Sequence, residues 1–388
     1  MRSVRLGIVV LAVLALTAAG CGGGGDEGGS QSPAATAASD ASVSLAGTCP
    51  ATIVIQTDWD PESEYGVYYH MLGPSPKIDS QHKQVSGPLV VEGKNTGVQL
   101  EVRTGGPSIG FEPVSSQMYK DTSITLGQVS TDEAIRFSAK QATQAVVAPM
   151  DKSPFMIMWD PATYPQLNTI ADIGKTDTKV LYFEGDTYMA YLTGTNVLKK
   201  SQVDGSYDGK PANFVAANGK VAQAGFATSE PYIYENEVRQ WHKPVKYALV
   251  SDAGCPCYPQ ALSIRTADKA KLAPCLKKLV PLVQRAQVDY LNNPAKTTEL
   301  LLQLVKEYNT GWVYSAGLAD YAIEKMRSDF VVNGPDKTLG NFDTARVQRM
   351  IDIVSPIFVA QRQPPKAGLK PEDIATNEFV DMSIGVGS

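Results

Sequence analysis

One tryptophan stands among four carboxylates in the stretch IQTDWDPESEYGVYY, residues 55–69. The four acids are Asp58, Asp60, Glu62 and Glu64. The ring of Trp59 could stack on a flat ligand while Asp58 or Glu64 accepts hydrogen bonds from an amino group of that ligand. The alternatives are that Trp59 packs in the core and that the acids form a solvated rim. The stretch predicts either the floor of a ligand pocket or a turn with an acidic edge.

The geometry of an extended chain limits how many of these side chains can share one cavity. Because side chains alternate along such a chain, Asp58 and Asp60 should share one side while Trp59 faces the other. We expect Asp60 and Glu62, on either side of Pro61, to be exposed or to lie at a helix start. Not all four acids can therefore line one cavity.

Three later segments carry polar side chains from the end of a strand to the start of a helix. In open α/β sheets such points face the ligand crevice. Together with the first stretch they give a predicted set of ligand-binding residues. The set is Asp58, Trp59, Glu64, Tyr65, Gly66, Gln128, Ser130, Gly185, Asp186, Thr187, Ser229 and Glu230.

Several of these residues also have a purely structural interpretation. Asp186 could be a plain helix N-cap. Backbone N–H groups at residues 185–187 could bind an anion, but the Asp186 carboxylate would repel it. Glu230 is favoured in a first helical turn whatever it contacts. Glu133 stands three positions after Ser130, so we expect a capping box there rather than a ligand contact.

The charge types of these segments restrict the ligand. A nitrate or sulfonate pocket should offer Arg or Lys side chains or unopposed helix N-termini. The candidate segments offer carboxylates and no arginine. This favours a neutral or cationic ligand with N–H donors. The rival is an anionic sulfonate, with Arg103 or Lys152 supplying the positive charge.

The first 47 residues predict export and anchoring. Residues 1–20 combine a basic start, an apolar run too short to span a bilayer comfortably and small residues, which is the pattern of a secretory signal peptide. Residues 18–21 resemble a bacterial lipobox, with Ala18 in place of the usual Leu, so Cys21 is the expected lipidated residue. Residues 21–47 are rich in Gly, Ser and Ala and predict a flexible tether.

Composition argues against several functions. The formal net charge is −5, and it becomes −7 once the two arginines of the signal are removed. No basic stripe is present, so we expect no nucleic acid partner. The histidines are few and remote from the cysteines, so we expect no metal site and no cofactor. The histidines are His70, His82 and His242.

Four cysteines besides Cys21 predict disulfides, because an exported protein meets an oxidising environment. They are Cys49, Cys255, Cys257 and Cys275. Three pairings are possible and all remain open. A bridge between Cys255 and Cys257 would be strained, so we expect each of these two to find its partner elsewhere in the chain.

The order of strand-like and helix-like segments predicts two α/β lobes, one inserted in the other. The first part of lobe 1 should span residues 48–148, and residues 145–159 should cross to the second lobe. Lobe 2 should span 149–246. The strand-like residues 244–250 should carry the chain back, and 247–388 should complete lobe 1 with a helix-rich region.

Several motifs in this order carry a resemblance to a known family. They are TDWDPESEYG, LGQVSTDEAI, APMDKSP, FEGDTYMAYL, GFATSEPYIYE and TLGNFDTARVQRMIDIVSPIF. Together they resemble the substrate-binding lipoproteins of ABC importers in the nitrate, sulfonate and taurine binding family, including its thiamine-pyrimidine-precursor branch. The resemblance implies a two-lobed periplasmic-binding-protein fold of type II, with two crossover strands and a ligand held in the cleft.

The resemblance also sets expectations for function. We expect a monomeric receptor, anchored outside the cytoplasmic membrane through Cys21, that delivers a small molecule to an ABC permease. An aminopyrimidine thiamine precursor fits the charge argument, and a sulfonate, taurine or nitrate is the alternative. A pyrimidine synthase-like enzyme is the third possible function. The sequence shows no nucleophile, base and orienting group at a recognisable spacing. We therefore expect no enzymatic activity.

Overall fold

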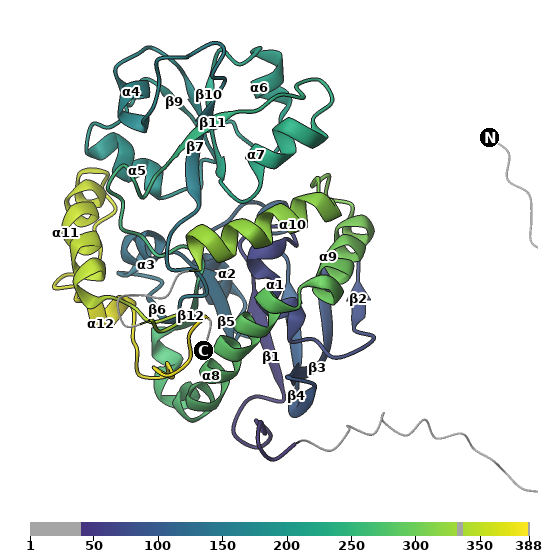
Figure 1. The fold of residues 1–388 in the computed structure, drawn as a ribbon. Helices are drawn as coiled ribbons and strands as arrows, with labels where there is room; N and C mark the ends of the chain where they lie inside the picture. The colour runs from purple at the N-terminus through teal and green to yellow at the C-terminus, as the bar shows by residue number, and fades with distance from the viewer. Residues whose placement is uncertain (1–39, 332–336, 387–388) are drawn as a thin grey trace, which may run out of the picture. The chain divides into compact units, whose positions relative to one another are not determined.

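The computed structural model of the protein describes residues 40–331 and 337–386 (Figure 1). The expected signal peptide, the lipidation site Cys21 and residues 21–39 of the expected tether lie outside the described residues. Residues 40–47, which we also expected in the tether, pack instead on the folded body. Val43 and Leu45 are buried. The backbone N–H of Leu45 donates to the Thr96 carbonyl at 2.8 Å, which fixes this segment beside a strand.

The first lobe is built on a seven-stranded sheet with the order β2-β3-β4-β1-β5-β12-β6. Its strands are β1 (Thr52–Gln56), β2 (Lys77–Asp79), β3 (Gln84–Val91), β4 (Lys94–Arg103), β5 (Leu126–Val129), β6 (Thr143–Val147) and β12 (Ala261–Arg265). Strand β1 lies between β4 and β5 and runs parallel to both. Its apolar sequence suits this place, because a central parallel strand is covered on both faces.

The second lobe is built on a five-stranded sheet with the order β11-β7-β10-β8-β9. The strands are β7 (Phe155–Trp159), β8 (Val180–Leu181), β9 (Val203–Asp204), β10 (Ala222–Phe226) and β11 (Lys246–Leu249). Strand β7 is antiparallel to β10, with Phe155 opposite Phe226. The start of β7 and the end of β10 therefore lie at the same edge of the sheet.

The chain crosses between the lobes twice, once after β6 and once before β12. The prediction that residues 244–250 return to the first lobe is wrong, because β11 pairs with β7 in the second sheet. The return is made by residues 250–260. Strand β12 then enters the first sheet antiparallel between β5 and β6. Two lobes joined by two crossings, as the sequence predicted, are confirmed.

Helices cover both faces of the first sheet. The helices of the described residues are α1 (Gly66–His70), α2 (Val114–Lys120), α3 (Thr131–Phe137), α4 (Ile170–Gly174), α5 (Tyr188–Gly194), α6 (Ala212–Ala216), α7 (Glu230–Tyr232), α8 (Lys269–Asn292), α9 (Ala295–Tyr308), α10 (Ala316–Lys325), α11 (Thr344–Ala360) and α12 (Pro371–Ile374). Helices α1, α8 and α9 pack together on one face, and α2, α3 and α12 lie on the other (Figure 1). Helix α11 packs on both α3 and α5, so it contacts both lobes.

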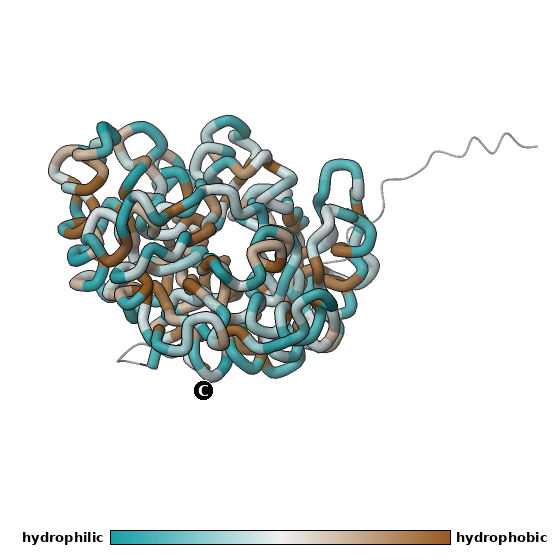
Figure 2. Tube along the Cα trace, turned by 90° about the horizontal axis from the view of Figure 1, so that it is seen from above, coloured by the Kyte–Doolittle hydropathy of each residue, from teal (hydrophilic) through white to brown (hydrophobic). Residues whose placement is uncertain are grey.

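Short helical turns extend some of these helices or lie in the loops between elements. They are the 3-10 helices η1 (Ser63–Tyr65), η2 (Gly106–Ile109) and η4 (Thr266–Asp268), and the π-helical turns η3 (Ile233–Glu237) and η5 (Met326–Phe330). Hydrophilic residues predominate along the outer loops of the trace (Figure 2). None of the helices within residues 40–331 and 337–386 is long and apolar enough to span a bilayer.

Arg346 on α11 ties the two crossings together. Its guanidinium donates to the Asp151 carboxylate at 3.0 Å and to the carbonyl of Cys257 at 2.9 Å. It also donates to the carbonyls of Pro256 and Asp151. Charge-assisted bonds of this kind are stronger than neutral ones. The side chain therefore holds the two interlobe segments side by side.

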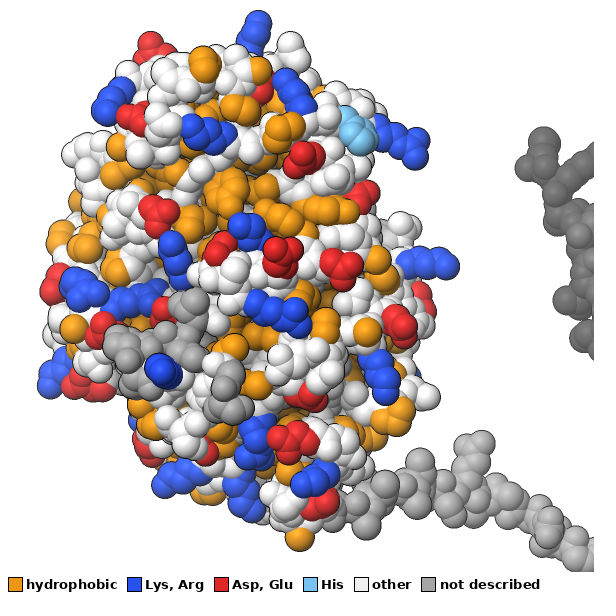
Figure 3. Space-filling view, in the orientation of Figure 1, with side chains coloured by type: hydrophobic (Ala, Val, Ile, Leu, Met, Phe, Trp, Pro, Cys, Tyr) orange, Lys and Arg blue, Asp and Glu red, His pale blue; other side chains and the backbone are white. Residues whose placement is uncertain are grey.

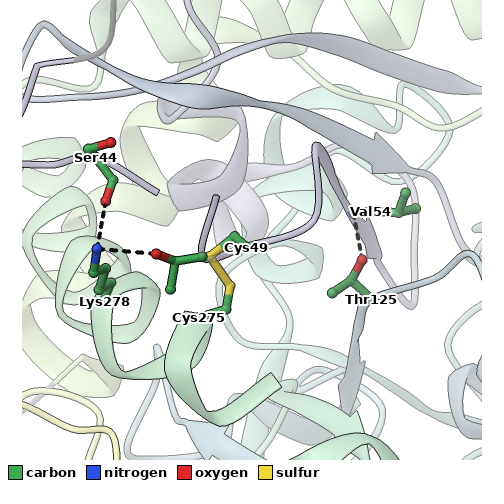
Figure 4. Close-up of a disulfide and its surroundings, with 7 residues drawn as sticks. Ser44, Cys49, Val54, Thr125, Cys275 and Lys278 are labelled. Atoms are coloured by element: carbon green, nitrogen blue, oxygen red, sulfur yellow. Dashed lines mark hydrogen bonds between the residues drawn. A yellow bond between two sulfur atoms is a disulfide. The ribbon is translucent and has the colours of Figure 1, made fainter. Parts of the chain in front are cut away.

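One disulfide joins Cys49, just before β1, to Cys275 on α8 (Figure 4). Cys49–Cys275 is one of the disulfides that the three possible pairings of the four cysteines allow. The expectation that Cys255 and Cys257 each have a partner elsewhere is wrong: both are unpaired and buried in the second crossing. The physical reason is position, because Cys49 lies against α8 while the second crossing runs beneath α11.

Candidate ligand-binding site

A cavity lies between the two lobes and is lined by residues from both. Its volume is about 130 Å³. At about 30 Å³ for each water in the liquid, it has room for roughly four water molecules. The site therefore suits a small molecule. On the face shown in Figure 3, hydrophobic side chains gather along the border between the lobes.

Nine of the twelve predicted ligand-binding residues line this cavity. The nine are Asp58, Trp59, Tyr65, Ser130, Gly185, Asp186, Thr187, Ser229 and Glu230. The other three lie behind the wall. Glu64 is buried at 1% exposure, Gln128 is buried within β5, and Gly66 packs against the ring of Tyr290, where a Cβ would collide with it.

Trp59 stands at the centre of an aromatic cluster that spans the lobes. Its ring centroid lies 5.7 Å from that of Phe183 in the second lobe, with the planes nearly perpendicular. It lies 6.0 Å from Phe111 and 6.1 Å from Trp312. Gly209 approaches the same indole so closely that a Cβ there would lie 2.7 Å from it. Trp59 is half-buried and lines the cavity, so it is not a pure core residue.

The predicted alternation of Asp58, Trp59 and Asp60 is wrong. Residues 58–61 bend instead of extending the strand, and Asp58 and Trp59 both reach the cavity. Asp60, which we expected to be exposed or at a helix start, is 2% exposed and accepts a hydrogen bond from the Thr310 hydroxyl at 2.8 Å. Glu62 does stand at the start of η1, but it also lines the cavity.

Seven aromatic residues of the lining were not predicted. They are Phe111, Phe155, Phe183, Tyr188, Tyr207, Phe226 and Trp312. In the second lobe, Phe155 begins β7, Phe226 ends β10, and Phe183 and Tyr207 come shortly after β8 and β9. The ring centroid of Phe155 lies 4.6 Å from that of Tyr188, with the planes tilted, and 4.7 Å from that of Phe226, edge to face, and the three rings close one wall. The sequence could have predicted these residues from the aromatic side chains that stand at or next to strand ends.

Carboxylates make up most of the polar lining. They belong to Asp58, Glu62, Glu112, Glu133, Asp186 and Glu230. Among the described residues that line the cavity there is no Lys, Arg or His. Arg103 and Lys152, the cations proposed for an anionic ligand, pair elsewhere: Arg103 with Glu101 at 2.7 Å and Lys152 with Asp252 at 3.1 Å. The charge argument from the sequence therefore gains support from the lining.

In the second lobe, the carboxylates of the cavity accept hydrogen bonds from neutral donors. Glu230 accepts hydrogen bonds from the Tyr207 hydroxyl at 2.9 Å and from the Phe226 N–H at 2.6 Å. Asp186 accepts from the Tyr188 hydroxyl at 2.9 Å. Asp186 does not cap α5, because Thr187 takes the N-cap position. These bonds orient carboxylates without neutralising them.

In the first lobe, Glu133 is not part of a capping box. Its carboxylate accepts from the backbone N–H of Ser115 on α2 at 3.0 Å, and the Ser130 side chain makes no cap hydrogen bond. Glu133 thus faces the cavity that we expected it to avoid. Asp58 accepts from Nε2 of Gln260 at 3.3 Å, and the same nitrogen donates to the Tyr65 hydroxyl at 2.7 Å.

Burial raises the pKa of these acids. The pKa of Asp58 rises to about 6, that of Glu133 to about 7 and that of Asp186 to about 8, in each case chiefly because the carboxylate is removed from water. Burial also raises the pKa of Glu230. The pKa of Glu62 is raised well above its usual range, first by burial and then by the charges of Glu64, Glu230 and Asp58. Burial in the cavity therefore shifts these carboxyls towards their protonated form.

Two lining residues hold unusual backbone conformations. Gln260 has φ of 45° and Phe111 has φ of 60°, both in the left-handed region. Side chains other than glycine rarely adopt it, and such strain is concentrated at functional sites. Gln260 comes from the second crossing and Phe111 follows η2. Both place a side chain into the cavity.

A direct hydrogen bond closes the lobes on one side of the cavity. The Thr187 hydroxyl at the start of α5 donates to Asp132 on α3. Asp132 is buried, and its second oxygen has no partner among the described residues. The lobes are thus held together beside the cavity.

The remaining candidates for chemistry lie away from the cavity. His70 bonds Thr297 at 2.8 Å and Asp289 at 2.9 Å, so it is packed between helices. Within the described residues no group of three or more His, Cys, Asp or Glu side chains is arranged to hold a metal ion.

Comparison with known proteins shows the fold. No family model matches the chain, and no curated protein matches it in sequence. The periplasmic aliphatic sulphonate binding protein SsuA from Escherichia coli is similar in structure, with 14% identity and a TM-score of 0.53 over 86% of this chain and 92% of that one. This chain has a periplasmic-binding-protein fold.

Two further structures support that assignment. The alkanesulfonate-binding protein SsuA from Xanthomonas axonopodis pv. citri, bound to MOPS, has 14% identity and a TM-score of 0.54 over 84% of this chain and 99% of that one. The periplasmic nitrate-binding protein NrtA from Synechocystis PCC 6803 has 10% identity and a TM-score of 0.51 over 85% and 87%. At these identities the likeness establishes the periplasmic-binding-protein fold, and the ligand must be argued from this chain's own cavity.

Proposed function

We propose that the protein is the substrate-binding component of an ABC importer and captures a small neutral or cationic, N–H-bearing molecule between its lobes. One observation carries this proposal: the interlobe cavity is walled by aromatic rings and carboxylates, and its described lining contains no basic side chain. Rings supply apolar contact to a flat ligand, and carboxylates accept hydrogen bonds from its N–H groups.

An aminopyrimidine thiamine precursor is the candidate ligand. Such a ring is flat, has an exocyclic amino group and fits a space of this size. Trp59 would pack against its face, and Asp58 or Glu62 would accept from the amino group. The side-chain amide oxygen of Gln260, which has no hydrogen-bond partner among the described residues, offers a further acceptor. The polar groups of the cavity are therefore matched to a ligand that donates hydrogen bonds.

A sulfonate, taurine or nitrate is the rival ligand, since proteins named for sulfonates and nitrate share the fold. The lining argues against it. An anion would find no Arg or Lys fork in the described lining, and any of Asp58, Glu62 and Glu230 that ionises would repel it in a space of low dielectric.

A pyrimidine synthase-like enzyme is the less favoured alternative. That chemistry calls for a cofactor-binding lysine, a reactive histidine and a cysteine-rich motif. The described lining offers none of these residue types. Carboxylates held by neutral donors and faced with aromatic rings suit binding instead.

The remaining parts of the proposal concern partners and location. The two-lobed fold suits delivery to an ABC permease, because lobes that close on a ligand present a different surface to the permease. We place the receptor outside the cytoplasmic membrane as a monomer, held there through a lipid on Cys21. Mass spectrometry of the membrane-bound form would show whether Cys21 carries that lipid.

A thermal-shift screen tests the ligand. Hydroxymethylpyrimidine, thiamine, taurine, an alkanesulfonate, nitrate and polyamines would each be added to the purified protein, since a ligand that binds only the folded state raises its melting temperature. We expect a shift from the amine-bearing ligands. Trp59→Ala should abolish it, and Trp59→Phe, which keeps a ring, should retain part of it. A shift from sulfonates or nitrate alone would contradict the proposal.

A further inference from the structure

Most carboxylates of the cavity have no ion-pair partner among the described residues. Glu62 shows this best, because it is 4% exposed and lines the cavity. The neutral Tyr65 side chain lowers its pKa by hydrogen bonding, but no cation of the described residues acts on it. The groups that face it are Asp58, Glu64 and Tyr65 from its own segment and Glu230 from α7. All are acidic or neutral.

Two cations that act on acids near the cavity direct hydrogen bonds to neutral groups elsewhere. Arg136 on α3 acts on Glu133, but its Nε donates to Gln363 at 2.7 Å. Lys83 acts on Asp60, but its ammonium donates to the Ser80 and Tyr308 carbonyls at 2.6 Å.

At the rim, Lys120 neutralises Glu112 at 2.5 Å. None of the three cations, Lys83, Lys120 and Arg136, lines the cavity. Glu112 is the one lining carboxylate with such a partner among the described residues.

Several ionised carboxylates cannot share a space of low dielectric without a positive charge. In the empty cavity the available positive charge is the proton. In the occupied cavity it is the ligand. The geometry of Glu62 and its neighbours thus links the ligand's charge to the protonation of the receptor.

We propose that the ligand binds as an organic cation with N–H donors, and that it displaces a proton held by the cavity carboxylates around Glu62. This rests on the proposed function. In the exchange, a neutral carboxyl releases its proton to solvent, and the resulting carboxylate accepts an N–H of the cation. No covalent bond forms, and charge balances because one positive charge replaces another.

The unpartnered polar atoms of the wall indicate why the cation must carry N–H groups. Oε1 of Gln260 is an acceptor in a residue 2% exposed, and it has no partner among the described residues. Carboxylates are acceptors as well. Among the fully buried side-chain atoms of the described lining, the indole N–H of Trp312 is the one donor without a partner. A quaternary ammonium without N–H would leave Gln260 unsatisfied, which costs binding free energy.

Calorimetry tests the exchange. Thiamine would be titrated into the protein at pH 7 in two buffers with different ionisation enthalpies, which reports the protons released. Hydroxymethylpyrimidine serves as the uncharged comparison, because it carries a related aminopyrimidine ring without thiamine's thiazolium ring and its permanent charge. We expect release of about one proton with thiamine and, if one proton is exchanged, up to tenfold tighter binding for each pH unit between 6 and 8.

Variants separate the charge from the shape. Glu62→Gln should reduce both the proton release and the affinity for thiamine, while Glu299→Gln, an exposed acid on α9, should change neither. Tighter binding of the uncharged pyrimidine than of thiamine at pH 8, or binding without proton release, would overturn this inference and leave the proposed function standing. Binding of sulfonates in their place would overturn both.

A measurement on the empty protein tests the proton without any ligand. Carbon-13 NMR of glutamate-labelled protein would follow the carboxyl signals between pH 5 and 9. We expect a carboxyl that remains protonated at pH 7 in the wild-type protein and is missing in Glu62→Gln. If every glutamate has ionised by pH 6, no proton is held for exchange and the inference fails, whichever ligand the receptor takes.

Discussion

Replacement of Glu64 by glutamine should stabilise the empty protein, and the gain should depend on pH. Glu64 is 1% exposed, and neither carboxylate oxygen has a hydrogen bond of ordinary geometry to a described residue. Burial raises its pKa from 4.5 to about 7, while the nearby Thr228 hydroxyl lowers it slightly. The Thr228 hydroxyl is also buried and has no hydrogen-bond partner of ordinary geometry among the described residues. The side-chain amide of a glutamine at position 64 can therefore form a hydrogen bond with it.

The magnitude follows from the pKa difference. In the unfolded chain Glu64 ionises near its ordinary pKa, and in the folded protein it keeps its proton until about pH 7. Ionisation therefore favours unfolding as pH rises from 4.5, and the effect is complete above pH 7. A difference of about 2.5 units corresponds to roughly 3 kcal/mol in the free energy of unfolding, at about 1.4 kcal/mol for each unit. Glu64→Gln removes that cost.

Urea unfolding at pH 5 and pH 8 measures the effect. Glu64→Gln should exceed the wild-type protein in stability by about 3 kcal/mol at pH 8 and by much less at pH 5. Glu299→Gln is the control and should match the wild-type protein at both values. A loss of stability at pH 8, or the same gain at both pH values, would show that Glu64 is ionised and paired in the folded protein.

Three other changes probe the frame around the cavity. Replacing Cys49 and Cys275 together by serine opens a loop whose ends are 226 residues apart, which should lower the free energy of unfolding by about 5 kcal/mol in chemical denaturation. Gly209→Ala places a Cβ against Trp59 at a φ of 83°, and we expect a loss of ligand-induced thermal shift larger than the loss of melting temperature. Asp132→Ala removes the bond between the lobes and should weaken ligand binding by roughly ten- to a hundredfold in calorimetry, since a lost hydrogen bond to a charged group is worth about 1.5–3 kcal/mol. Unchanged affinity in Asp132→Ala would show that this bond does not contribute to closure.

The sequence predicts the strands and long helices well because their patterns are local. TIVIQ forms β1 with four of its five residues buried, and its apolar character on both faces is sufficient to predict a central strand. The apolar spacing of residues 267–291 predicts α8 in the same way. Pairing between strands is not local. Strand β11 has the same short apolar pattern wherever it pairs, so the sequence could not assign it to the second sheet.

The site is only partly predictable for a related reason. Residues next to a strand end, such as Asp58 and Asp186, share a signal that topology explains. Gln260 and Trp312 reach the cavity from segments whose neighbours in sequence give no hint of it. Glu133 fits a capping box by spacing, yet the N–H of Ser115 on another helix takes its carboxylate. A tertiary contact thus overrides a local motif.

Equilibrium dialysis at pH 8 against hydroxymethylpyrimidine, thiamine and ethanesulfonate tests the central claim most directly, because it compares binding of N–H-bearing ligands with binding of an anion. The acidic, aromatic cavity predicts saturable binding of an amine-bearing ligand, lost in Trp59→Ala, and no binding of the sulfonate. Saturable binding of ethanesulfonate with none of either amine-bearing ligand would contradict the account.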